Sequence, residues 1–157
     1  MKEEKRIYIK KISKKDNLIK KDRDFKVNFL SFIELKDIKG ILEFIDLCRT
    51  INNFEYSSDD IKDMMVDNDN ISYIIYDNDS AVGFIISHIN SEQLNYKILE
   101  IDNIGILDEY KNNKYKNSII NEIINKAWDL NVDMIKVSIR DDFILNSLEK
   151  MSFVKSE

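Results

Sequence analysis

Two carboxylates and a lysine-rich loop stand close together in the sequence. Glu100 and Asp102 lie two positions apart in the alternating segment "YKILEIDNIGIL" (96–107). Side chains two apart on a strand point to the same face, where a carboxylate can act as a general base. The following segment, "LDEYKNNKYKNSIINEIINKAW" (107–128), runs from a polar loop into an apolar helix. A helix N-terminus presents unpaired N–H groups and a positive dipole end, so it can hold a phosphate.

Both features also have a purely structural interpretation. Glu100 and Asp102 fit the polar, solvent-facing side of an alternating strand equally well. The loop fits a solvated helix start. Lys114 and Lys116 do not exclude an anion, because helix-start dihedral angles are open to any L-residue and an ammonium group attracts phosphate. We therefore favour retained phosphate binding, and both interpretations stay open.

Other kinds of site find little support. His88 is the only histidine and has no partner at motif spacing, which favours a surface or core histidine. No Gly-Lys-Ser/Thr phosphate loop occurs. The single Cys48 allows no internal disulfide and no multi-cysteine metal site, so a cytoplasmic location is expected. No signal peptide is recognised, and no apolar run approaches the roughly 20 residues of a membrane span.

Charge divides the chain unevenly. Residues 1–23 hold ten Lys or Arg against four Asp or Glu, which leaves fourteen against twenty-five for the rest. We therefore predict a basic N-terminal arm (1–24) and one acidic domain (25–157). A basic arm can contact nucleic acid or an acidic membrane surface, or dock onto its own acidic body. No aromatic stacking motif or basic recognition helix accompanies it, so the solvated or self-docked arm is favoured over nucleic acid.

Hydrophobic periodicity predicts a mixed α/β (α+β) fold. The expected sheet is mostly antiparallel with helices on both faces, and its crossover from the 96–107 strand makes one parallel pair. The helix from Tyr115 has an apolar stripe that ends in Ala127 and Trp128, which predicts packing on the sheet. The predicted elements are strand 25–33, helices 34–51 and 57–68, hairpin 71–89, strand 96–107, helix 115–128, strand 131–140 and helix 141–153. An Asp pair at the start of the last helix suits an N-cap.

This order, with the residues from Ile98 to Phe153, resembles the GNAT family of N-acetyltransferases, whose members bind acetyl-CoA at a helix N-terminus after the fourth strand. A typical family loop reads Pro-Glu-Tyr-Arg-Gly-x-Gly-x-Gly. Here Glu109, Tyr110 and the basic Lys111 agree with it. The three family glycines are replaced by Asn112, Lys114 and Lys116.

Two further segments carry the resemblance. Val82-Gly83 stands where the family commonly has an apolar residue and Gly at the opening of its third strand. The ending "DDFILNSLEKMSF" resembles the family's Asn-x-x-Ala-x-x-x-Tyr-x-x-x-Gly-Phe. Phe153 agrees, while Leu148 and Ser152 stand at the Tyr and the Gly.

The resemblance implies an acyl-CoA N-acyltransferase-like fold and an enzyme that transfers an acetyl or other acyl group from acetyl-CoA to an amine. The acceptor is a small-molecule or protein amine. Glu100 is the preferred base, with Asp102 on the same face. Leu148 cannot donate the proton that the family's Tyr supplies, so water would serve as the acid. The implied cofactor-binding residues are Ile104, Ile106, Lys111, Asn112, Asn113, Lys114, Tyr115, Lys116, Asn117 and Asp141.

A second interpretation comes from another functional class. The lost glycines and Leu148 also fit a GNAT-shaped module that acts by protein contact or acyl-CoA sensing. The preserved Glu-Tyr-Lys entry and the apolar helix favour the enzyme, which we place slightly ahead.

The chain's end gives one more expectation. The family adds a strand after the Phe153 position, where only "VKSE" remains here. We expect either residues 6–12 or a second subunit, as in a homodimer, to cover the open edge of the 131–140 strand.

Overall fold

One sheet with helices on both faces makes up the described part of the chain. The computed structural model describes residues 6–12, 27–31, 38–52, 56–93, 95–139 and 142–156. Its strands are β1 (Arg6–Lys11), β2 (Val27–Ser31), β3 (Tyr73–Asp77), β4 (Ser80–Gln93), β5 (Tyr96–Ile106), β6 (Met134–Ile139) and β7 (Val154–Ser156). Its α-helices are α1 (Ile38–Asn52), α2 (Ser58–Val66), α3 (Asn113–Asp129) and α4 (Leu145–Lys150).

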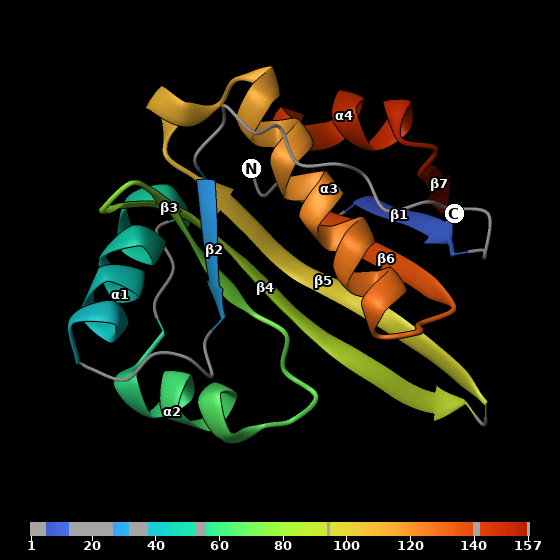
Figure 1. Ribbon diagram of the computed structural model, residues 1–157, viewed down its shortest axis with the longest axis horizontal. Helices are drawn as coiled ribbons and strands as arrows, with labels where there is room; N and C mark the ends of the chain where they lie inside the picture. Colours follow the sequence, from blue (N-terminus) through green and yellow to red (C-terminus); the bar gives the residue numbers. More distant parts are fainter. Residues whose placement is uncertain are drawn as a thin grey trace.

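The seven described strands are ordered β2-β3-β4-β5-β6-β1-β7 (Figure 1). All neighbouring pairs are antiparallel except β5 and β6, which are parallel and joined through α3. This confirms the predicted mixed, mostly antiparallel sheet. The β3–β4 turn follows the predicted "DNDS" cluster, where Asn78 adopts a positive φ of 54°.

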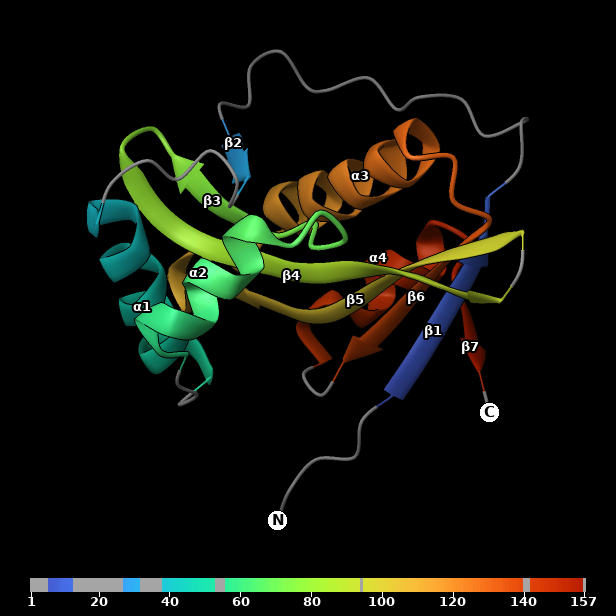
Figure 2. The same cartoon turned by 90° about the horizontal axis from the view of Figure 1, so that it is seen from below.

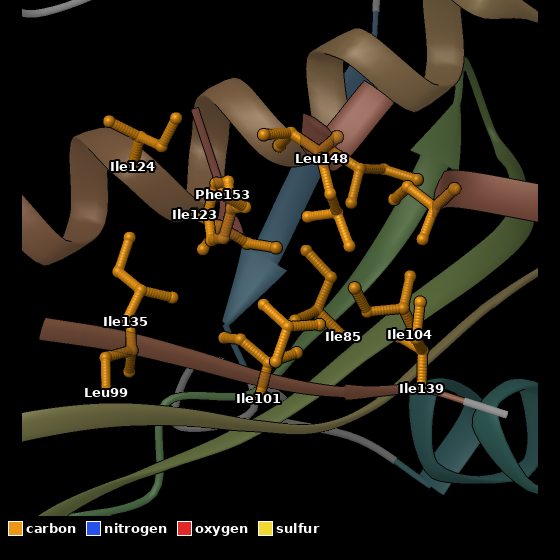
Figure 3. Close-up of a cluster of buried hydrophobic side chains, with 14 of the residues drawn as sticks. Ile85, Leu99, Ile101, Ile104, Ile123, Ile124, Ile135, Ile139, Leu148 and Phe153 are labelled. Atoms are coloured by element: carbon orange, nitrogen blue, oxygen red, sulfur yellow. The ribbon is translucent and has the colours of Figure 1, made fainter. Parts of the chain in front are cut away.

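Each face of the sheet has its own apolar core. Figure 2 shows α3 on one side of the sheet and α1 and α2 on the other. Helices α3 and α4 cover one face, where Leu99, Ile101 and Ile135 meet Ile123 and Leu148 (Figure 3). Helices α1 and α2 cover the other face through residues that include Phe44 and Ile61. The isoleucines and alanine of the α3 stripe are buried, as the 3.6-residue period predicts. Packing of Trp128 was predicted wrongly, because its side chain remains 41% exposed.

The N-terminal strand covers the edge of β6. Tyr8 pairs with Val137 on one side and with Lys155 on the other, so β1 lies between β6 and β7. Tyr8 is only 3% exposed. Beyond the end of β1, the Ile12 N–H continues the contact by donating to the Asp133 carbonyl at 3.0 Å. The first of the two expected routes, residues 6–12, is therefore confirmed.

The last helix begins later than its sequence predicts. Residues Asp142–Ile144 form a 3₁₀ turn, and α4 starts at Leu145 with Ile144 as an N-cap that makes no side-chain bond. Neither Asp therefore caps α4 itself; Asp141, which directly precedes the 3₁₀ turn, lies outside the described residues, so a cap by Asp141 stays a prediction. Burial of Ile144 and Leu148 against the sheet, rather than capping, sets where this helix lies.

Replacing Ser152 by Gly is expected to stabilise the fold by about 1 kcal/mol. Ser152 stands where the family has Gly and adopts φ 70°, a left-handed conformation that costs residues with a Cβ about 1–2 kcal/mol. Urea unfolding measures the change. Asn131→Gly is the matched comparison, since Asn131 has φ 55° but Asn tolerates this region better. A larger gain at Asn131 than at Ser152 would contradict the explanation.

Candidate active site at the β4–β5 bulge and the N-terminus of α3

An irregularity in the β4–β5 pairing brings three polar side chains together. Ser87 pairs with Ile101 and Ile86 with Asn103, so Asp102 is an extra residue of β5. Such a bulge re-aims side chains locally. His88 pairs directly with Glu100, and Asp102 turns to the same side. Glu100 and Asp102 therefore share a face, as their spacing predicts.

The segment before β3 fixes the β4 backbone at this bulge. The Ser87 N–H donates to Ser72 Oγ at 3.2 Å, and the Ile71 N–H donates to the Ser87 carbonyl at 2.9 Å. An isolated bridge also joins Asn70 to His88. These contacts extend the pairing of β4 beyond the end of β3, on the edge away from β5, and they hold the backbone around His88 in place.

His88 lies between the two carboxylates. Its Nδ1 is 2.7 Å from Asp102 Oδ2, and its Nε2 is 2.9 Å from Glu100 Oε2. Glu100 is the better anchored carboxylate, because the Asn90 amide donates to its Oε1 at 3.4 Å and Lys136 Nζ lies 3.8 Å from the same oxygen. The amino-acid sequence does not reveal the contacts of His88, because its partners lie on the next strand rather than at motif spacing.

Tyr56 adds a phenol beside this cluster. Burial, and after it the nearby Cys48 and Asp102, raise its pKa to about 12, while a side-chain hydrogen bond with Asn103 acts in the opposite direction. Its ring packs on Phe44 with the centroids 5.4 Å apart. At neutral pH Tyr56 therefore stays protonated and can donate a hydrogen bond. Sequence analysis missed it, since the residue lies between the two helices far from the strand motif.

Strands β5 and β6 separate at the same level. Their parallel pairing runs from Ile98 with Met134 to Ile101 with Val137 and ends there, although β5 continues to Ile106. Beyond this point the side of β5 that faces β6 can offer backbone groups to an extended ligand. The predicted residues Ile104 and Ile106 lie here, with side chains buried under α3, so a ligand can meet only their backbone.

The loop after β5 delivers the chain to the start of α3. It makes a 3₁₀ turn at Asp108–Tyr110, and Asn112 then caps the helix by accepting the Tyr115 N–H at 3.3 Å. Lys111 Nζ lies 2.9 Å from Asp108 Oδ1 and 5.2 Å from the centroid of the Phe143 ring. The side chains of Asn113, Lys114 and Asn117 are exposed and that of Lys116 is half-buried.

Tyr115 points into the protein instead of toward a ligand. Its hydroxyl donates to Asp77 Oδ2 at 2.5 Å, and its ring meets Tyr110 edge to face at 5.2 Å. Burial, followed by the bond to Asp77, raises its pKa well above the ordinary value. Tyr115 thus ties the β3–β4 turn to α3, and it can offer a ligand only its backbone.

The amino-acid sequence also matches a family model. Residues 38–144 match the acetyltransferase (GNAT) family. The chain belongs to the GNAT family. No curated protein sequence matches it.

Solved structures share the GNAT fold. An aminoglycoside acetyltransferase from an uncultured soil metagenomic sample, in complex with trehalose, superposes with a TM-score of 0.67 at 15% identity, over 83% of this chain and 89% of its own. Arabidopsis thaliana Naa50, in complex with the bisubstrate analogue CoA-Ac-MVNAL, superposes with a TM-score of 0.65 at 15% sequence identity. The match covers 83% of this chain and 85% of the Naa50 chain. The ribosomal-protein-S18-alanine N-acetyltransferase of Escherichia coli superposes with a TM-score of 0.65 at 10% sequence identity, and the match covers 84% of this chain and 80% of the enzyme's chain.

Two departures from the GNAT pattern have structural consequences. Leu148, at the family's Tyr position, is fully buried in the core under α3 and α4. Asn112, at a family Gly position, uses its side chain to cap an amide at the helix start. Gly83, by contrast, agrees with the family. A Cβ at this position would lie 2.5 Å from the Gly105 carbonyl oxygen, so no larger residue fits without a shift of the backbone.

The helices give no sign of a membrane span. Within the described residues, none combines the length and the apolar character needed to cross a bilayer.

Proposed function

We propose that this protein is an N-acetyltransferase that uses acetyl-CoA as the acyl donor and an amine as the acceptor. The observation that carries the proposal is the continuity of the site. The end of β5, beyond its last pair with β6, runs from the Glu100–Asp102 cluster directly into the loop and N-terminus of α3. Backbone amides at that terminus suit the pyrophosphate, and the β6-facing side of β5 beyond Ile101, where pairing with β6 has ended, suits the amide groups of an extended pantetheine arm.

The chemistry requires a neutral amine. Glu100 takes the amine proton, directly or through a water molecule, and the nitrogen attacks the thioester carbonyl carbon. The C–N bond forms, the C–S bond breaks, and the departing thiolate receives a proton. Leu148 cannot supply that proton from the core, so water does, with the protonated Tyr56 phenol as a further donor on the Asp102 side of the sheet.

The acceptor is an amine of a small molecule or a protein. Two neighbours in fold are named as acetyltransferases of an aminoglycoside and of a ribosomal protein. The segment of α2 and the turn after it (58–70) is acidic, since it holds Asp59, Asp60, Asp63, Asp67 and Asp69 against one basic residue, Lys62. This charge favours a cationic amine through electrostatic steering.

Acetyl-CoA is expected to raise the melting temperature, because a ligand that binds only the native state stabilises it. Lys111→Glu and Lys114→Glu should weaken binding, and the weakening should shrink in high salt, as expected for charges near a phosphate. Differential scanning fluorimetry and calorimetry measure both effects. Lys62→Glu, the same charge change on α2, should leave the affinity unchanged. An unshifted melting temperature at millimolar acetyl-CoA would remove the cofactor assignment.

Asn112→Gly is expected to tighten acetyl-CoA binding severalfold. The variant frees the Tyr115 amide that the Asn112 side chain now occupies, and Gly at an N-cap costs only a few tenths of a kcal/mol. Calorimetry measures the affinity. Asn146→Gly, on the exposed face of α4, should lower stability by a few tenths of a kcal/mol without changing the affinity. Weaker binding by Asn112→Gly would show that the capped amide does not compete with the ligand.

The alternative is a GNAT-shaped module that acts by protein contact or senses acyl-CoA. The burial of Leu148 and the side-chain cap by Asn112 favour it, since both remove features that the family's enzymes use. Acetyl-CoA binding without transfer to any amine would support this alternative.

A further inference from the structure

We propose that His88, Glu100 and Asp102 form a binding site for a divalent transition-metal ion, specifically zinc. One ligand atom from each residue lies within 4.8 Å of the other two. Within the part of the chain that the structure describes, no other group of three or more His, Cys, Asp or Glu side chains brings its ligand atoms this close together. The three residues come from two hydrogen-bonded strands, so their backbones hold fixed relative positions.

The donor set suits zinc better than a hard cation. One imidazole nitrogen and two carboxylate oxygens form a mixed N/O set, whereas Mg²⁺ and Ca²⁺ take oxygen ligands. Zinc bonds of about 2.0–2.2 Å place tetrahedral ligand atoms about 3.4 Å apart. The two carboxylates contact opposite ring nitrogens of His88, so an ion bound at Nε2 keeps Glu100 near its present place and requires the Asp102 side chain to turn away from Nδ1. The Asp102 side chain, 46% exposed, has the freedom to make that rotation and leaves a fourth position open to water.

The surroundings orient the ligands. Asn90 and Lys136 both hold Oε1 of Glu100, at 3.4 and 3.8 Å, so Oε2 faces His88 and the ion. Contacts of this outer kind fix ligand geometry at metal sites. The Lys136 ammonium group also places a positive charge beside the two carboxylates, and this charge repels a bound cation. Its removal should therefore strengthen binding.

This inference does not depend on the proposed acetyl transfer. The two share Glu100 and Asp102, so a bound zinc ion would withdraw Glu100 from proton transfer. Metal binding is measured without acetyl-CoA or an amine, and its failure would leave the transferase proposal untouched. Failure of the transferase proposal would likewise leave the metal site standing.

The test is a calorimetric titration of the full chain, stripped with chelator, with Zn²⁺ alone. One ion per chain is expected, and His88→Gln, Glu100→Gln and Asp102→Asn should each weaken the affinity at least tenfold. Asp63→Asn, an exposed carboxylate on α2, is the matched control and should not change it. Co²⁺ should give a visible absorption band that His88→Gln abolishes, and Mg²⁺ should not compete.

Two results would overturn the proposal. One is no binding at millimolar zinc. The other is an affinity that His88→Gln leaves unchanged in a variant whose melting temperature is near that of the parent, because scattered surface carboxylates would then account for the binding. Lys136→Gln gives a readout that needs no loss of a ligand. It should tighten binding severalfold, and an unchanged affinity would contradict Glu100 as a ligand.

Discussion

Glu100→Gln is expected to lower the turnover of acetyl transfer by about two orders of magnitude, while the affinity for acetyl-CoA stays near that of the parent chain. Loss of general-base assistance typically has this size. The amide keeps the shape of the side chain and its contact with Asn90, so the fold should be preserved. Steady-state kinetics with an amine acceptor, run with chelator present, measures turnover without any contribution from a bound metal ion.

Asp102→Asn is the internal comparison for this experiment. Asp102 shares the face of Glu100 and the contact with His88, but it is more exposed and stands at the bulge where β5 leaves β6. We expect its replacement to change substrate binding more than turnover. Equal losses of turnover in the two variants would argue against Glu100 as the specific base. If the parent chain binds acetyl-CoA but acetylates no member of an amine library, the base assignment and the enzyme proposal fall together.

Deleting residues 1–12 is expected to destabilise the protein severely. The deletion removes the strand between β6 and β7, which leaves the backbone groups of β6 open along that edge. Tyr8→Ala tests the same contact more gently and should cost about 3–5 kcal/mol, the usual cost of truncating a large buried aromatic side chain. Urea unfolding measures both changes.

Light scattering after size-exclusion chromatography follows the oligomeric state of the same variants. The open β6 edge of the deletion variant should recruit a second copy or aggregate. Lys11→Thr, at an exposed position of β1, serves as the control and should change stability by less than about 0.5 kcal/mol. Unchanged stability and unchanged oligomeric state after the deletion would show that β1 does not hold the sheet together.

Local patterns determined most of the elements. The apolar stripe from Ile119 to Ala127 predicts α3, because a 3.6-residue period sets one helix face against a core. The Asn and Asp residues of the β3–β4 turn and the alternation along β5 likewise indicate their strands without knowledge of neighbours. The same local information places Glu100 and Asp102 on one face and the lysine-rich loop at a helix start. The family resemblance rests on these short segments, and the match over residues 38–144 bears it out.

Long-range pairing decided the rest. The sequence leaves open whether residues 6–12 or a second subunit covers the 131–140 strand, and only the pairing places Tyr8 between Val137 and Lys155, because strand partners distant in sequence leave no local pattern. The same reason hid the contact of His88 with Asp102, which depends on a bulge in the pairing of two strands. A sequence period also cannot show how far a core extends. Trp128 continues the α3 stripe yet stays partly exposed, because burial depends on which neighbours the tertiary structure places against each face.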